Sequence, residues 1–255
     1  MSQTITVTYD GTFSGFLTTI FETYEYKWNN PIIKPNNQFE TELFSTAHHV
    51  ITEDTKTARV AASLKKLLGA ASFTRLYYAF LSENPGIENT MLNVVRYAFK
   101  AQKNVIADYG NSDVLEISKI AKKVGREKHR MEAFVRFQET KDGIYFSNIE
   151  PDFNVLPLIK KHFESRYADQ KWIIYDLKRS YGLFYNLEHT QSIHLEFDKN
   201  FSITDPKAVF SSEELQHQVL WKDYFKHTNI EERINTALHI KHVPKRYWKY
   251  LTEKQ

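Results

Sequence analysis

Residues 117–149, ISKIAKKVGREKHRMEAFVRFQETKDGIYFSNI, contain the change of hydrophobic period that decides the fold class. Up to Met131 the apolar residues recur at helical spacing, which predicts an amphipathic helix with one apolar stripe. After Phe134 they alternate with a period of two, and the turn-forming residues 141–143 divide this segment into the arms of a β-hairpin. The chain therefore passes from a helix into a small sheet. The apolar stripe consists of Ile117, Ile120, Val124 and Met131.

The sequence before this stretch is mostly helical in pattern. Residues 5–9 alternate like a strand, a turn follows at residues 10–12, and apolar spacing predicts a helix over 13–28. Residues 29–38 contain two prolines and are interpreted as a loop. Three further helices are expected between residues 56 and 102. They are separated by Gly69 and by the Asn84-Pro85-Gly86 turn, and Asn111-Ser112-Asp113 can cap the helix that follows.

The sequence after residue 149 mixes helical and strand patterns. We expect an α+β fold with a mostly helical N-terminal part, followed by a small antiparallel sheet that packs with helices. This sheet would consist of the hairpin and two or three more strands. A soft boundary near Gly110 divides the chain into residues 1–110 and 111–255. The expected elements are a helix near 154–166, strands at 172–176, 181–185 and 192–197, and helices at 213–226, 230–237 and 244–251.

The composition excludes several kinds of chemistry. The chain has 255 residues with no cysteine, so disulfides, thiolate zinc sites, iron–sulfur clusters and a cysteine nucleophile are ruled out. Only 8 residues are glycine, and no glycine-rich phosphate loop or nucleophile elbow is found. We expect no cofactor and no metal site. The sequence shows no secretory signal and no membrane span, so a cytoplasmic protein without membrane contact is expected.

The most informative segment for function is residues 119–136. It carries seven Lys or Arg and two Glu, a local charge of 7 − 2 = +5 within a chain whose net charge is +3. The helical rotation puts Lys122, Arg126, His129 and Arg130 opposite the apolar stripe, which would form a cationic ridge able to hold phosphates. The alternative is a helix face that only water solvates.

Two carboxylates in this part of the chain are candidate acids or bases. Glu127 lies close to the apolar stripe, and a carboxylate turned inward must be paired or protonated. It is either the structural partner of an arginine or a general acid or base. Asp176 ends an apolar strand, where it would either start a turn or act at a site on the rim of the sheet. The candidate partners of Glu127 are Arg136, Arg166 and Arg179.

Residues 241–250 combine cations with aromatic rings and contain no acid. Single-stranded nucleic acid is bound by this combination, because bases stack on the rings while cations neutralise the backbone. Lys245, Arg246 and Trp248 are the candidate contacts. Alternatively, Pro244 begins a helix that docks on the protein through its apolar side.

Several segments together resemble one protein family over nearly the whole chain. They are Tyr9-Asp10-Gly11-Thr12-Phe13, Val124-x-Arg126-Glu127-x-His129-Arg130-Met131, Trp172-Ile173-Ile174-Tyr175-Asp176-x-x-Arg179 and Pro244-x-x-Tyr247-Trp248. The sequence is similar to the bacterial "probable DNA metabolism proteins" that carry domain of unknown function 4130. The resemblance implies a role with DNA and a putative DNA modification or repair radical-SAM protein encoded nearby. Such a partner would hold the iron–sulfur cluster, because this chain lacks the cysteines.

Three functions are compatible with these observations. The first is an accessory protein that binds single-stranded or distorted DNA and presents it to the radical-SAM partner. The second is an enzyme acting on DNA bases or the DNA backbone, with Glu127 or Asp176 as acid or base and His129 as proton shuttle. The third is a protein–protein adaptor, which an exposed apolar patch made of Trp28, Tyr77, Tyr78 or Trp248 would favour. The expected nucleic-acid contacts are Lys122, Arg126, Arg130, Arg136, Arg179, Lys245, Arg246 and Trp248.

Overall fold

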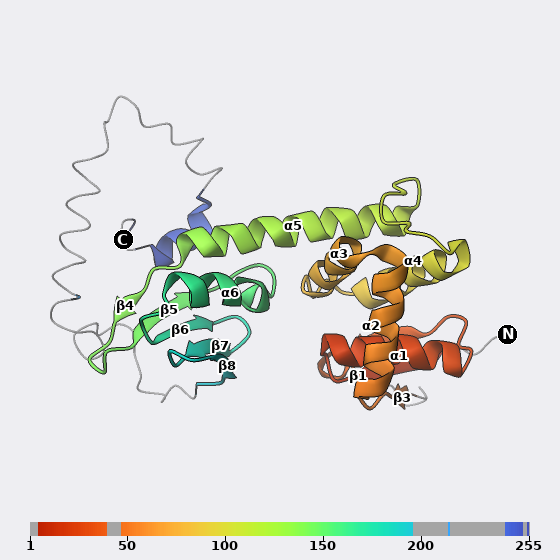
Figure 1. The fold of residues 1–255 in the computed structure, drawn as a ribbon, viewed down its shortest axis with the longest axis horizontal. Helices are drawn as coiled ribbons and strands as arrows, with labels where there is room; N and C mark the ends of the chain where they lie inside the picture. The colour runs from red at the N-terminus through yellow and green to blue at the C-terminus, as the bar shows by residue number, and fades with distance from the viewer. Residues whose placement is uncertain (1–4, 40–46, 196–213, 215–242, 252–253, 255) are drawn as a thin grey trace, which may run out of the picture. The chain divides into compact units, whose positions relative to one another are not determined.

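The computed structural model describes residues 5–39, 47–195, 214, 243–251 and 254. The chain divides into two compact units, residues 1–125 (unit 1) and 126–255 (unit 2), which are described one at a time. The fold is α+β as expected, with helices leading at the N-terminus (Figure 1). The helices expected at 213–226 and 230–237 lie outside the described residues, apart from residue 214.

Unit 1 contains a three-stranded parallel sheet with the order β2-β1-β3. Its strands are β1 (Thr6–Tyr9), β2 (Ile32–Pro35) and β3 (Ala47–His49), and Thr6 pairs with both Ile32 and Ala47. The interpretation of residues 29–38 as a loop was therefore wrong. Pro35 is compatible with β2 because β2 is an edge strand, where one backbone N–H can be missing. The strand is followed by the short 3₁₀ helix η1 (Asn36–Gln38).

The described part of unit 1 also contains four complete α-helices. They are α1 (Phe13–Glu25), α2 (Asp54–Leu68), α3 (Ala70–Phe80) and α4 (Ile87–Ala101), which confirms the expected helical region. The Thr12 side chain caps α1 by accepting a hydrogen bond from the Gly15 N–H at 2.9 Å. Gly69 and Gly86 separate the later helices with φ angles of +79° and +80°, a backbone region that favours glycine.

The core of unit 1 encloses a buried carboxyl group. Glu88 in the first turn of α4 accepts a hydrogen bond from the Tyr9 hydroxyl at 2.9 Å, and only 7% of Glu88 is exposed. Burial raises the pKa of Glu88, and the hydrogen bond from Tyr9 opposes that rise only in part. Val7, Phe16 and Ile20 belong to the apolar core of the same unit.

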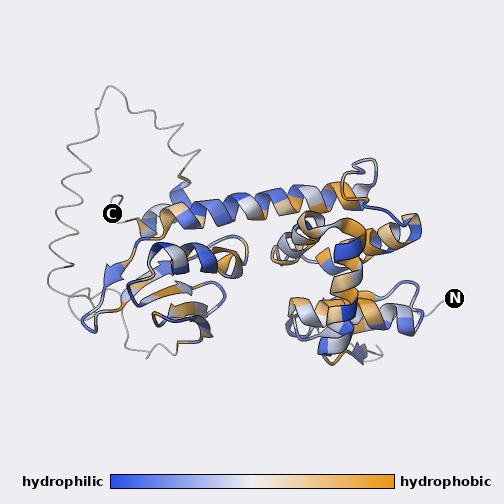
Figure 2. Cartoon of the chain, viewed as in Figure 1, coloured by the Kyte–Doolittle hydropathy of each residue, from blue (hydrophilic) through white to orange (hydrophobic). Residues whose placement is uncertain are grey.

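Helix α5 (Ser112–Phe134) contains the cationic segment except for its last two residues, and it is continuous through Gly125, where the two units divide. The Asn111 side chain caps its first turn by accepting hydrogen bonds from the N–H groups of Asp113 at 3.0 Å and Val114 at 3.1 Å. Figure 2 shows hydrophilic colour over much of α5, interrupted by apolar bands. The predicted apolar stripe is confirmed, since Ile117, Val124 and Met131 are buried.

Unit 2 is built on a five-stranded sheet with the order β4-β5-β6-β7-β8. Helix α6 (Leu156–Arg166) lies between β5 and β6 in sequence, and these two strands pair in parallel. The expectation of an antiparallel sheet was wrong at this pair, because a connection that contains a helix allows a parallel return. The strands are β4 (Gln138–Glu139), β5 (Tyr145–Ile149), β6 (Trp172–Asp176), β7 (Tyr181–Tyr185) and β8 (Thr190–Ile193).

The C-terminal segment forms the 3₁₀ helix η3 (Lys245–Tyr250) instead of the α-helix expected over 244–251. Its N–H groups bond three residues back, as in Tyr247 to the Pro244 carbonyl at 3.0 Å. At 6 residues η3 is long for a 3₁₀ helix, since runs of more than three or four residues are uncommon. Tyr247 is nevertheless buried, so this segment docks on unit 2 through a side chain of the expected apolar side.

Gly125 provides a test of the helical character of α5. A Cβ atom at this position would lie 3.6 Å from the Tyr78 ring, an ordinary contact distance. Gly125→Ala should therefore raise the free energy of unfolding by about 1 kcal/mol, the difference in helix propensity. The measurement is urea denaturation followed by circular dichroism. Gly86→Ala is the control and should destabilise, because its φ of +80° strains any residue with a Cβ. A destabilised Gly125→Ala variant would contradict the regular helix.

Glu88 predicts a dependence of stability on pH. Its pKa is raised in the folded state, so the folded protein holds the proton over a range in which the unfolded chain has released it. The resulting stability is present below the ordinary glutamate pKa and is lost as pH rises through the raised value. Glu88→Gln keeps an acceptor for Tyr9 and cannot ionise. The variant should therefore gain stability relative to the wild type between pH 4 and pH 7, measured by urea denaturation. A stability difference between the variant and the wild type that does not change with pH would refute the raised pKa of Glu88.

Candidate nucleic-acid interface

The exposed face of α5 carries four cations that we name the α5 cationic stripe: Lys119, Lys122, Lys123 and Arg126. All four are exposed, and none has an ion-pair partner among the described residues. Their spacing of three, one and three residues puts them on one side of the helix over about 10 Å. Lys122 and Arg126 thus lie on the outer face, as the helical rotation predicts.

The cations that follow on α5 are paired. Lys128 lies 2.7 Å from the Glu132 carboxylate, and Arg130 lies 3.4 Å from the Glu127 carboxylate. His129 is exposed over 85% of its side chain, and its Nδ1 is 4.0 Å from Glu132. Because two residues along a helix correspond to about 200°, His129 points away from Glu127. The proposed acid–base pair of Glu127 and His129 is therefore not brought together.

Glu127 is buried, with 1% of its surface exposed, as its position near the apolar stripe predicts. One carboxylate oxygen, Oε1, accepts hydrogen bonds from the Tyr247 hydroxyl and from the Asp152 N–H at 2.9 Å. The other, Oε2, faces Arg130 at 3.4 Å and Arg246 at 3.3 Å. The expected partners Arg136, Arg166 and Arg179 were wrong, because the pattern within one segment does not show which distant arginine approaches.

Asp176 is a second buried carboxylate at the end of β6. Its Oδ1 accepts hydrogen bonds from the N–H groups of Lys178 at 2.9 Å and Arg179 at 3.2 Å, which is the geometry of an Asx turn. Its Oδ2 lies 2.9 Å from the Arg179 guanidinium. Burial raises the pKa of Asp176, while Arg179 opposes this rise.

The two buried carboxylates hold the same loop, Glu150-Pro151-Asp152, which we name the 150–152 loop. Glu127 binds the Asp152 N–H, and the Arg179 guanidinium donates to the carbonyls of Pro151 and Asp152 at 3.2 Å each. Arg179 is in turn held by Asp176. The loop therefore has its backbone N–H and C=O groups bonded from two sides.

A pocket of about 420 Å³, the 150–152 pocket, opens beside this loop. Arg246 reaches Asp152 at 2.6 Å, and Lys249 reaches Glu150 at 2.5 Å. The neighbouring Lys249 and the Tyr250 hydroxyl lower the pKa of Glu150, because both stabilise its charged form. Four cations and two carboxylates line the pocket, an excess of 4 − 2 = +2 charges. The cations are Lys178, Lys245, Arg246 and Lys249.

The remaining residues of the C-terminal segment are also engaged. The Trp248 indole N–H donates to the Val243 carbonyl at 3.0 Å, and the Lys245 ammonium lies 6.0 Å from the Trp248 ring centre. Burial raises the pKa of the Tyr247 hydroxyl, and its bond to Glu127 adds to the rise. The basic and aromatic pattern therefore also serves to attach this segment to unit 2.

The structure gathers only part of the predicted contact set. Arg130 and Arg246 meet at Glu127, and Arg179 joins Arg246 at the 150–152 loop. Lys122 belongs to unit 1, and Arg136 donates to the Ala133 and Val135 carbonyls at 2.7 and 3.2 Å. Sequence reasoning missed Glu150, Lys178 and Lys249 as pocket residues. The sequence signal for Lys178 was its position two residues after Asp176, and the signal for Lys249 was its position next to Trp248.

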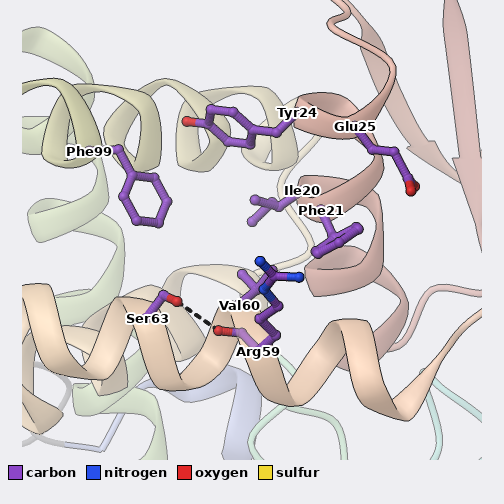
Figure 3. Close-up of a pocket in the computed structure, with 8 residues that line it drawn as sticks. All are labelled: Ile20, Phe21, Tyr24, Glu25, Arg59, Val60, Ser63 and Phe99. Atoms are coloured by element: carbon purple, nitrogen blue, oxygen red, sulfur yellow. Dashed lines mark hydrogen bonds between the residues drawn. The ribbon is translucent and has the colours of Figure 1, made fainter.

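A second pocket, of about 490 Å³, lies in unit 1 among α1, α2 and α4 (Figure 3). Phe21, Tyr24 and Phe99 contribute aromatic rings, and the Arg59 guanidinium lies 5.5 Å from the Phe21 ring centre. The aromatic patch expected for an adaptor is not openly exposed, because its four members are half-buried. These members are Trp28, Tyr77, Tyr78 and Trp248.

Two negative findings apply to the described part of the chain. No group of three or more His, Asp or Glu side chains is placed there to hold a metal ion. The adjacent His48 and His49 contact different partners, Glu22 and Thr8. No helix in the described ranges combines the length and the apolar character needed to cross a bilayer.

Glu127→Gln tests the structural role of the buried carboxylate. The variant keeps the shape but loses the charge that holds Arg130 and Arg246, so it should lower the free energy of unfolding by about 1–3 kcal/mol. The cost stays below that of a fully buried pair because both arginines reach solvent. Glu116→Gln is the control, because Glu116 is an exposed acid on the same helix with no ion-pair partner among the described residues, and it should change the free energy of unfolding by at most about 1 kcal/mol. Equal melting temperatures for Glu127→Gln and the wild type would disprove this role.

The comparisons with known proteins give one match. No curated protein and no solved structure matches the chain. A family model described as "Domain of unknown function (DUF4130)" matches residues 85–253. The matched range begins before α4, contains all of α5 and extends to the last residues of unit 2. Because this match covers more than half of the sequence, the chain belongs to the DUF4130 family.

Proposed function

We propose that this protein is an accessory protein that binds DNA, single-stranded or distorted, and presents it to a radical-SAM partner encoded nearby. The observation that carries the proposal is the α5 cationic stripe, in which four exposed cations have no ion-pair partner among the described residues. Cationic side chains without an internal partner are available to neutralise phosphates. Contacts of this kind supply most of the affinity in non-specific nucleic-acid binding.

The difference between the unpaired earlier cations and the paired later cations of α5 supports this proposal. Glu127 and Glu132, the two acids of the cationic segment, both follow Arg126 and pair with the later cations Arg130 and Lys128. The stripe before them therefore keeps its full positive charge. A purely solvated helix face gains stability from ion pairs at spacings of three or four residues. The stripe forms no such pair among the described residues, although Glu116 precedes Lys119 by three residues and Glu127 follows Lys123 by four.

The 150–152 pocket is a second place where unit 2 could contact phosphate. Its cations exceed its carboxylates by two, and Lys245 has an aromatic contact but no carboxylate partner among the described residues. Arg246 and Lys249 are already paired, so a phosphate would have to share them with Asp152 and Glu150. We therefore assign the pocket a supporting contribution and the stripe the main one.

The state of the candidate acids favours an accessory protein over an enzyme. Both oxygens of Glu127 and both oxygens of Asp176 accept hydrogen bonds or face an arginine. A general acid or base needs a proton or a lone pair directed at the substrate. One of the present partners would have to leave before either residue could act in this way.

The radical-SAM partner follows from the family resemblance and is tested separately. The two proteins should copurify when they are expressed together, and nuclease treatment distinguishes direct contact from a link through DNA. Copurification that resists nuclease supports a direct partner. Loss of the complex on nuclease treatment supports joint binding to DNA, and failure to copurify in either condition contradicts the partnership.

DNA binding predicts a specific ranking of lysine and arginine variants. Lys123→Ala and Arg126→Ala should each weaken binding to a short oligonucleotide and reduce the slope of log affinity against log salt by about 0.7–1. Lys128→Ala removes the same charge from a paired position and should change both quantities less. The measurement is fluorescence anisotropy between 20 and 200 mM salt, with melting temperatures as a check on folding.

Arg130 is a poorer probe, because it also holds Glu127 and its loss would affect stability. Two outcomes oppose the proposal. Absence of binding at low salt would refute it, and equal effects at Lys123, Arg126 and Lys128 would show that only net charge matters.

A further inference from the structure

A third pocket lies in unit 1 between α3 and the first part of α5, and it encloses about 520 Å³. On α3 it is lined by positions three and four residues apart, Thr74, Arg75 and Tyr78, and on α5 by Ser118 and Lys122. Small residues on both faces, Ala71 and Ala121, leave the space between the longer side chains open. The two helices therefore form a hollow instead of a closed contact.

The rim of this pocket is cationic and has no carboxylate. Arg75 and Lys122 both line it, both are exposed, and neither has an ion-pair partner among the described residues. Two unpaired cations beside one hollow attract a group of concentrated negative charge, and a guanidinium matches the oxygens of a phosphate. The chemistry of the rim thus points to a phosphate.

The rest of the lining fits a planar polar ring. Tyr78 and Tyr109 contribute aromatic surface, and Tyr109 is 53% exposed, so its ring can be reached from solvent. The Ser118 hydroxyl oxygen is buried and has no hydrogen-bond partner in the described structure. A buried polar atom without a partner is rare in native proteins, so a ligand that supplies one would remove a destabilising defect.

We propose that this pocket binds one unstacked nucleotide of a single strand, with its base against Tyr109 and Tyr78 and its phosphate on Arg75 and Lys122. The proposal rests on the proposed DNA binding and deepens it, because Lys122 belongs to both the pocket and the α5 cationic stripe. Aromatic rings and cations that act together are the usual means of binding single strands without reading their sequence. Ser118 would hydrogen-bond to a polar group of the base.

The first experiment isolates the base. A fluorescent single-stranded thymidine oligonucleotide is compared with a strand of equal length whose sugars carry no bases, so that both present the same phosphates. The wild type should bind the complete strand about 5-fold or more tightly, the effect expected for stacking of one base. Tyr109→Ala should abolish this preference without changing the salt dependence. Tyr26→Ala is the matched control, because Tyr26 is 52% exposed and does not line the pocket.

The second variant isolates the phosphate. Arg75→Ala should reduce the slope of log affinity against log salt by about 0.7, the value for one contact to a single strand. Arg59→Ala is its control, because Arg59 is an exposed arginine of the same unit that lines a different pocket. Arg75 lies outside the stripe, so the variant tests the pocket and not the proposed main interface.

The location is checked directly by photo-crosslinking. An oligonucleotide with one 5-iodouracil base should crosslink to Tyr78 or Tyr109, identified by mass spectrometry of the peptides. Crosslinks confined to other aromatic residues would overturn the assignment. A base preference that survives Tyr109→Ala would overturn it as well, and so would thymidine 5′-monophosphate binding as tightly as the strand, since the site would then serve free nucleotides.

The two proposals fail in different ways. If the strand with bases and the strand without bases bind equally, while Lys123→Ala still weakens both, the pocket assignment is wrong and DNA binding by the stripe stands. If neither strand binds at low salt, both proposals are wrong.

Discussion

The carboxylate of Glu127 is the constraint on which the arrangement of unit 2 depends. It joins three segments that are far apart in the sequence: the second half of α5, the 150–152 loop and the C-terminal 3₁₀ helix. A buried charge is tolerated only with partners, and here two guanidinium groups, a hydroxyl and a backbone N–H provide them. The C-terminal 3₁₀ helix thus docks because the buried charge of Glu127 on α5 needs its partners Arg246 and Tyr247. Aromatic packing between Phe134 and Tyr247 adds to this attachment.

The same principle explains why the 150–152 loop is well placed to border a pocket. A loop normally has unpaired backbone groups that water satisfies. Here the Asp152 N–H donates to the buried carboxylate of Glu127. Arg179, which is paired with the buried carboxylate of Asp176, donates to the loop carbonyls. The two carboxylates first considered as acid or base therefore act on backbone conformation. Because the two carboxylates fix the loop, they also fix the position of the charged side chains that the loop presents to solvent at the pocket.

The sequence predicted local structure well where one helix or strand was enough to define it. The apolar stripe of α5 and the inward position of Glu127 follow from rotation about a single helix, and both are found. The parallel pairing of β5 and β6 depends on how a connection returns, which the pattern of either strand does not contain. Strand β2 escaped detection because its Pro35 indicates a loop unless the strand is known to lie at an edge. Partners were the hardest to predict: Glu127 meets Arg246, 119 residues away, and no periodicity relates them.

The positions of the acids along α5 determine which of its cations form ion pairs within the described part of the protein and which stay unpaired on its surface. Had Glu127 and Glu132 been spread through the segment, each could have neutralised a cation of the stripe across one helical turn. Both instead follow Arg126, and Glu127 is withdrawn into the interior, where it neutralises Arg130 and Arg246. The charge of +5 is therefore not uniform: the later cations stabilise the fold, and the earlier ones remain exposed without internal partners in the described structure. Cations that are grouped in this way raise the local positive potential of the surface more than the same charges interleaved with acids would.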